Sequence, residues 1–114
     1  MIRWARVSTR FEGLHCWPQA TEEVRFLLHL HRHEFHVTLW IEQYHDQRDV
    51  EYITLKRWLK DLLDAGFPES FSCEAMAREI IFSARQAYGP ERKYQCEVLE
   101  DGENGALLEL RGDS

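Results

Sequence analysis

Positive charge is scarce in this sequence of 114 residues. Its 14 lysines and arginines are outnumbered by 20 aspartates and glutamates, which gives a formal net charge of −6. The basic residues are scattered and form no long stripe, whereas a nucleic-acid-binding domain normally presents a basic face. We therefore expect no nucleic-acid partner.

Long apolar runs and paired cysteines are lacking as well. No stretch approaches the roughly 18 consecutive apolar residues of a membrane-spanning helix, and the first ten residues carry three arginines instead of a signal peptide's apolar run. The three cysteines, Cys16, Cys73 and Cys96, are an odd number without CxxC spacing, which disfavours a disulfide framework. We expect no membrane partner and a location in the reducing cytoplasm.

The rest of the composition is that of one folded domain. Hydrophobic residues make up 44% of the chain, and no repeat or linker divides residues 1–114. Hydrophobic periodicity and turn residues predict an α+β domain, a four-stranded antiparallel sheet with two helices inserted after its second strand. The predicted elements are strands at residues 2–12 and 31–44, an irregular or partly helical connection between them, a helix capped by Thr54, a helix capped by Ser72, and strands at 94–99 and 106–110. Such a sheet has two exposed edges, and closure of several copies into a ring would cover them.

Histidines gather where the second strand begins. His31 and His33 lie two residues apart, so a strand projects both imidazoles from one face, and His15 ends the preceding predicted strand. Three histidines with an open fourth position are typical of catalytic zinc. The alternative is a solvated, histidine-rich strand. Because His33 shares its face with apolar residues that should point inward, we favour a metal, while His29 is open to three roles: a further ligand, a proton shuttle or a loop residue.

Other reactive side chains give weaker signals. Glu74 lies in the first turn of a predicted helix, where a carboxylate favours the helix dipole, and Glu100 ends a strand. Cys16 follows His15, and Cys73 lies at a helix N-terminus. Each of these thiols is either activated by a lowered pKa or inert.

Five short motifs occur in the order in which they occur in one known enzyme family. The chain resembles the 6-pyruvoyl-tetrahydropterin synthase / 6-carboxy-tetrahydropterin synthase family, whose members have the tunnelling fold. The family has a strand ending F-x-x-x-H, an H-x-H strand start, a V-x-D-F-x-x-L-K helix entry, a P-T-x-E-N helix start and a final V-x-x-E-T hairpin. The matching segments here are Phe11-Glu12-Gly13-Leu14-His15, His31-Arg32-His33-Glu34-Phe35, the imperfect Val50-Glu51-Tyr52-Ile53-Thr54-Leu55-Lys56, Ser72-Cys73-Glu74-Ala75-Met76-Ala77, and Val98-Leu99-Glu100 followed by Ala106.

This resemblance implies a ligand set and an assembly. It implies Zn²⁺ on His15, His31 and His33, and a substrate-binding role for Glu100, which anchors the amino-pyrimidine edge of a pterin-like or guanine-like ring. We assign Cys73 and Glu74 to substrate binding as well. The family forms rings, typically a hexamer of two stacked trimers with sites between subunits, so we expect a homo-oligomer.

Two departures from the family pattern concern proton transfer. The family's catalytic cysteine lies four residues before the first histidine of H-x-H, and this position is Leu27. The family's Asp-His pair falls in an L-D-H-x-x-L-N segment, which here reads Leu63-Asp64-Ala65-Gly66-Phe67. Leucine cannot move protons. His29 is our first choice as the substitute catalytic residue, and the others are Glu23, Cys16 and a Cys73 from another subunit.

Three functions remain open on this reading. The first is a zinc-dependent lyase or hydrolase acting on a pterin, a 7-deazaguanine-related compound or a guanine-nucleotide-like molecule. The second is a non-catalytic protein that binds a pterin, purine or nucleotide in an inherited pocket. The third is a structural or inhibitory ring protein with an incidental metal.

Overall fold

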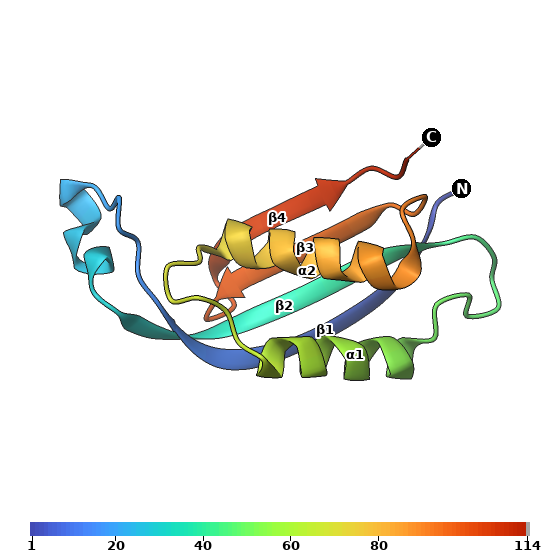
Figure 1. Cartoon of the computed structure of the whole chain (residues 1–114), viewed down its shortest axis with the longest axis horizontal. Coiled ribbons are helices and arrows are strands. Elements are labelled where there is room, and N and C mark those ends of the chain that lie inside the picture. Colours follow the sequence, from blue (N-terminus) through green and yellow to red (C-terminus); the bar gives the residue numbers. More distant parts are fainter. Residues whose placement is uncertain (114) are drawn as a thin grey trace.

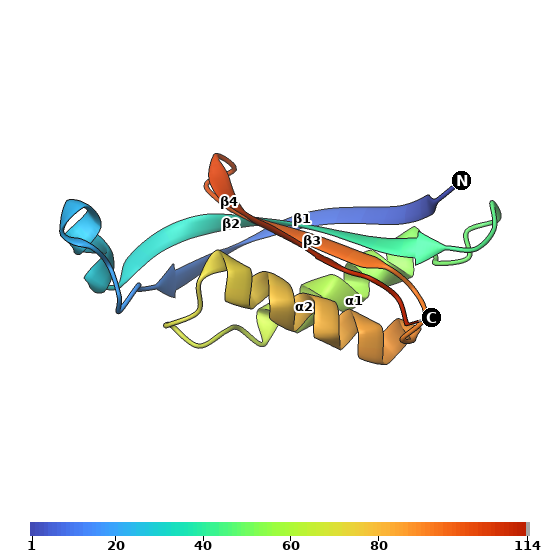
Figure 2. The same ribbon diagram turned by 90° about the horizontal axis from the view of Figure 1, so that it is seen from above.

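The computed structural model describes residues 1–113. It shows a four-stranded antiparallel sheet in the order β1-β2-β3-β4, with α1 and α2 on the same face (Figures 1 and 2). The predicted α+β class is confirmed, and the irregular connection contains one short 3-10 helix, η1. The elements are β1 (Arg3–His15), η1 (Glu22–Leu28), β2 (His31–Gln43), α1 (Tyr52–Asp64), α2 (Cys73–Tyr88), β3 (Tyr94–Glu100) and β4 (Asn104–Leu110).

The long β1–β2 ladder extends beyond the rest of the sheet. β1 continues past its predicted end at residue 12, and His15 pairs with His31 in the last step of the register. β3 joins β2 only from Phe35 onward, where Phe35 pairs with Glu100. The ends of β1 and β2 and the connection containing η1 therefore project from one end of the molecule (Figure 1).

The helix starts follow from side-chain caps, and one differs from the prediction. Ser72 caps α2 as predicted, because its hydroxyl accepts a hydrogen bond from the Ala75 amide at 3.1 Å. The predicted cap of α1 at Thr54 is wrong. The Glu51 carboxylate accepts from the amides of Ile53 and Thr54, and the Thr54 hydroxyl donates to it as well. Thr54 thus lies in the first turn. No helix within residues 1–113 is long and apolar enough to cross a membrane.

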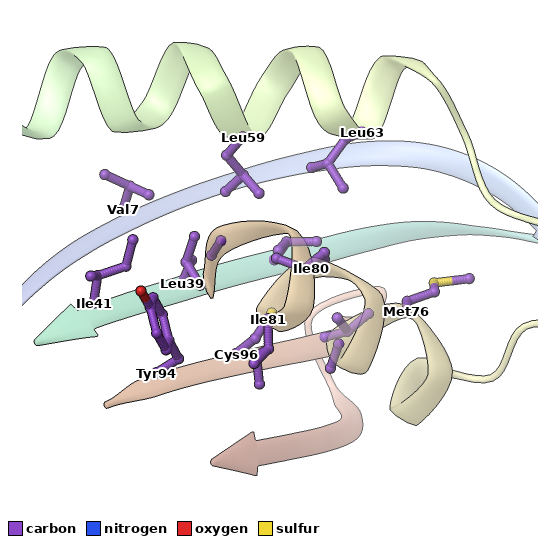
Figure 3. Packing of buried hydrophobic residues seen from close by; sticks show 14 of the residues in the cluster. Val7, Leu39, Ile41, Leu59, Leu63, Met76, Ile80, Ile81, Tyr94 and Cys96 are labelled. Carbon is purple, nitrogen blue, oxygen red and sulfur yellow. The ribbon is translucent and has the colours of Figure 1, made fainter. Parts of the chain in front are cut away.

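The core lies between the sheet and the two helices. Figure 3 shows Leu59 of α1 and Ile80 of α2 among the buried side chains between the helices and the strands. The alternation predicted for β2 is confirmed, because the side chains of Phe35, Val37, Leu39 and Ile41 are all buried. His33 continues this inward row past the end of the helical cover, and the metal-ligand candidates therefore begin where the apolar core ends.

Candidate metal centre

Three imidazoles from two paired strands converge at the projecting end of the sheet. His15 is the last residue of β1, and His31 and His33 are the first and third of β2. Their ring centroids are 4.5 to 5.4 Å apart, and one nitrogen of each lies within 4.8 Å of the others. The cluster forms because antiparallel pairing places His15 opposite His31, while strand alternation keeps His33 on the same face.

Each of the three rings is oriented by a hydrogen bond at its Nδ1 atom. Nδ1 of His15 lies 3.2 Å from the carbonyl oxygen of Phe71, and Nδ1 of His31 lies 3.0 Å from that of His29. Nδ1 of His33 lies 2.7 Å from Oδ2 of Asp101. Carbonyl and carboxylate oxygens only accept hydrogen bonds, so each Nδ1 carries a proton, and in the neutral form of each ring the lone pair then lies on Nε2.

These three Nε2 atoms are buried and lack a hydrogen-bond partner within residues 1–113. A buried polar atom left without a partner costs about 1–3 kcal/mol, and here three such atoms face one another. Burial also lowers the pKa of His15 below its ordinary value of 6.5, which favours the neutral, ligating form. A metal ion bound to all three nitrogens would satisfy them together, so the residues fit a His₃ metal site.

A carboxylate and a thiol stand beside the cluster. The Glu100 oxygens lie 3.5 Å from Nε2 of His15 and 3.3 Å from Nε2 of His33, without hydrogen-bond geometry. The Cys73 thiol donates to Glu100 at 3.8 Å. Burial, followed by the charge of Glu100, raises the pKa of Cys73 to about 12. Of the two readings of Cys73, the structure therefore supports the inert thiol over the activated one.

A cavity of about 470 Å³ opens next to His15 and His31. All three predicted substrate-binding side chains, Cys73, Glu74 and Glu100, lie on its wall. The connection between β1 and β2 supplies Trp17 and Leu27, and the edge strand β4 supplies Asn104. The cavity wall thus combines two of the three clustered histidines, two carboxylates and the Trp17 ring.

The structure places His29 apart from this cavity. Its side chain is exposed and contributes no nitrogen to the cluster, although its carbonyl oxygen orients His31. Glu23 is exposed in η1, and the half-buried Cys16 lies on the cavity wall. The catalytic role assigned to His29 stays a prediction.

Sequence reasoning missed the residues that orient the ligands. Asp101 reads as an ordinary turn residue, and Phe71 contributes only its carbonyl. The Asp-Gly pair after a strand signals a tight turn, but that signal does not reveal which ring the carboxylate contacts. Identifying Asp101 required the pairing of β2 with β3.

A comparison of the sequence with protein-family models found no match, and a search of curated proteins found none either. The site is therefore interpreted from its own geometry.

Proposed function

We propose that this protein is a zinc-dependent enzyme with the tunnelling fold, related to the 6-pyruvoyl-tetrahydropterin synthase / 6-carboxy-tetrahydropterin synthase family. Its substrate is a pterin, a 7-deazaguanine-related compound or a guanine-nucleotide-like molecule, and its chemistry is that of a lyase or hydrolase. One observation carries the proposal: three buried, unpartnered Nε2 atoms, those of His15, His31 and His33, face one another beside a cavity.

Zinc is the metal best suited to this set of donors. Three neutral imidazoles hold it well, and a His₃ set leaves a fourth coordination position for water or substrate. When bound, zinc supplies a Lewis acid that polarises a carbonyl or hydroxyl group. The protein contributes the orientation of the three rings, each held at Nδ1 by an acceptor.

Glu100 is the proposed anchor of the heterocycle. A carboxylate accepts two N–H bonds from an amino-pyrimidine edge, which fixes the orientation of the ring. The S–H bond from Cys73 orients this carboxylate, and Glu74 provides a second acceptor on the cavity wall. Glu100 borders both the histidines and the cavity, so a ring bound there lies beside the metal.

A non-catalytic ligand-binding protein is the second candidate. Leu27 lies on the cavity wall, and by the resemblance it corresponds to the family's catalytic cysteine. Cys73 remains a thiol at neutral pH because its pKa is about 12. His29 is the first choice for proton transfer from the sequence, but its exposed side chain is not part of the cavity wall. If no group transfers a proton, the pocket binds its ligand without turnover.

Self-association into a ring, with the homohexamer as the expected form, completes the proposal. Within residues 1–113 no strand covers the outer edges of β1 and β4, and Asn104 at the β4 edge lines the cavity. Basic side chains, among them Lys56 and Lys60, flank β1, whereas Glu109 is exposed on β4. An uncovered strand edge can pair with the uncovered edge of another copy. A monomeric mass in sedimentation equilibrium would contradict this part.

Three measurements test the function: zinc content, conversion of candidate substrates, and ligand affinity of a Glu100→Ala variant. Purified protein should contain about one zinc per chain, and the His33→Ala variant should lose it. Incubation with pterins, deazaguanines and guanine nucleotides, followed by mass spectrometry, should then reveal a converted compound. Retention of zinc by His33→Ala would refute the metal site. Tight binding of one of these compounds without its conversion would refute the proposed enzymatic activity. An unchanged affinity of Glu100→Ala for that compound would refute the role of Glu100 as the anchor of the heterocycle.

A further inference from the structure

We infer that Asp101 is a positioning residue of the metal centre. Its carboxylate keeps the proton of His33 on Nδ1, so that the lone pair on Nε2 is available to the metal. This inference rests on the proposed metal site and adds a residue that neither the histidine pattern nor the family resemblance assigns. It is carried by the contacts of the Asp101 carboxylate and by the two carboxylates that flank the His33 ring.

The Asp101 carboxylate is fixed through both of its oxygens. Oδ2 lies 2.7 Å from Nδ1 of His33, and Oδ1 accepts the backbone N–H of Glu34 at 3.0 Å. The Asp101 amide in turn donates to the carbonyl oxygen of Glu34 at 2.7 Å. Asp101 adopts a left-handed backbone conformation, with φ at 55°, which aspartate tolerates better than most residues. The turn thus holds the carboxylate against the residue that follows His33.

His33 is the ligand whose orientation depends on a side chain. The Nδ1 atoms of His15 and His31 donate to backbone carbonyls, which side-chain substitution does not remove. The bond at His33 is also the shortest of the three and is made to a charged acceptor. A carboxylate behind a ligating imidazole fixes its tautomer and raises its basicity.

Carboxylates lie on both sides of the His33 ring, and only Asp101 has hydrogen-bond geometry to it. Asp101 faces Nδ1 at 2.7 Å, while Glu100 faces Nε2 at 3.3 Å. With Asp101 in place the proton resides on Nδ1, and Nε2 is free for a metal. Without Asp101, the proton could reside on Nε2, close to Glu100, and in that tautomer Nε2 cannot bind a metal.

An isosteric variant separates this role from mere packing. In Asp101→Asn, the side-chain amide that replaces the carboxylate has one acceptor oxygen. If that oxygen keeps the Glu34 amide, the NH₂ group faces Nδ1 of His33 and forces the proton onto Nε2. If the side-chain amide were turned the other way, its NH₂ group would face the backbone N–H of Glu34, and two donors would oppose each other. The first arrangement is therefore favoured. Glu103→Gln is the matched control, because it removes a charge from the same turn, and the Glu103 side chain makes no hydrogen bond or ion pair within residues 1–113.

The experiment measures zinc affinity by competition with a chelator, together with the ¹⁵N chemical shifts of the imidazoles in metal-free protein at mildly alkaline pH. We expect Asp101→Asn to bind zinc about 10–100-fold more weakly than wild type, and Glu103→Gln to bind it as wild type does. The His33 proton should be on Nδ1 in wild type and on Nε2 in Asp101→Asn, while His15 keeps its tautomer in both and reports an intact fold.

Equal zinc affinity in wild type and Asp101→Asn would overturn the inference. So would a proton on Nε2 of His33 in wild type, a result that needs no variant. If wild type itself binds no zinc, the proposed metal site fails, and the ¹⁵N shifts still decide whether Asp101 sets the tautomer of His33.

Discussion

Zinc should raise the melting temperature of the metal-free protein, because the folded state alone brings the three histidines together. The perturbation is removal of metal by a chelator, followed by addition of zinc at about 100 times its dissociation constant. Binding under these conditions adds about 2.7 kcal/mol to the free energy of unfolding. At about 2.1 cal/mol/K per residue, the unfolding entropy of 114 residues is about 0.24 kcal/mol/K, so we expect a rise of about 11 °C.

Two alanine variants make this measurement specific. His33→Ala removes one of the three clustered nitrogens. If its affinity falls about 100-fold, the same zinc concentration contributes only about 0.4 kcal/mol, or about 2 °C. His29→Ala changes a neighbouring histidine outside the cluster and should keep the full shift. The assay is differential scanning calorimetry of all three proteins with and without zinc.

The proposed metal site is refuted if zinc leaves the wild-type melting temperature unchanged, or if His33→Ala shows the full shift. Loss of the shift in His29→Ala would instead place that residue in the metal site. Zinc binding to cysteines and histidines of the unfolded chain reduces every shift, and the comparison between the two variants corrects for this.

Three further outcomes are expected from other parts of the molecule. Glu51→Ala should lower the free energy of unfolding by about 1 kcal/mol in urea denaturation, because its carboxylate caps α1, and Glu51→Gln should recover part of the loss; equal stability of Glu51→Ala and wild type would contradict the cap. Iodoacetamide at neutral pH should modify Cys16, which is half-buried, long before Cys73, which is buried and has a pKa of about 12; peptide mass mapping that finds the reverse order would contradict the environment described for Cys73. The hydrogen bond from Arg92, followed by that from the Tyr44 amide, lowers the pKa of Asp49 below its ordinary 3.8. The Asp49–Arg92 ion pair therefore stabilises the fold above that pH, and this stability is lost as the pH falls through the folded pKa. Arg92→Leu should make the free energy of unfolding in urea less dependent on pH in this acidic range, and an unchanged dependence would argue against the ion pair.

The histidine cluster was largely predictable because it follows from local rules. His31 and His33 share a face by strand alternation, whatever the rest of the chain does. His15 was expected at the end of the preceding strand, although the predicted range stopped at residue 12, and antiparallel pairing of neighbouring strands brings it to His31. The grouping of the three residues as possible ligands is confirmed, while the identity of the metal stays a proposal.

The helix caps show where a local rule failed. Both Thr54 and Glu51 precede the apolar stripe of α1, and threonine is the commoner cap. Glu51 is the N-cap because its carboxylate accepts hydrogen bonds from two backbone amides and from the Thr54 hydroxyl. Propensity ranks residue types, but it does not count the hydrogen bonds that one side chain makes in place.

The sequence by itself determined the class of fold, the inward row of β2 and the histidines available to a metal, because alternation and capping depend on residues close together in the chain. Only the tertiary structure decided how those histidines are oriented. The Asp101 carboxylate and the Phe71 carbonyl reach their rings from elements distant in sequence. Likewise, the environment of Cys73 arises from burial beside Glu100 across the fold, which raises its pKa to about 12. Such contacts depend on strand register and helix packing, and no local pattern of residues encodes them.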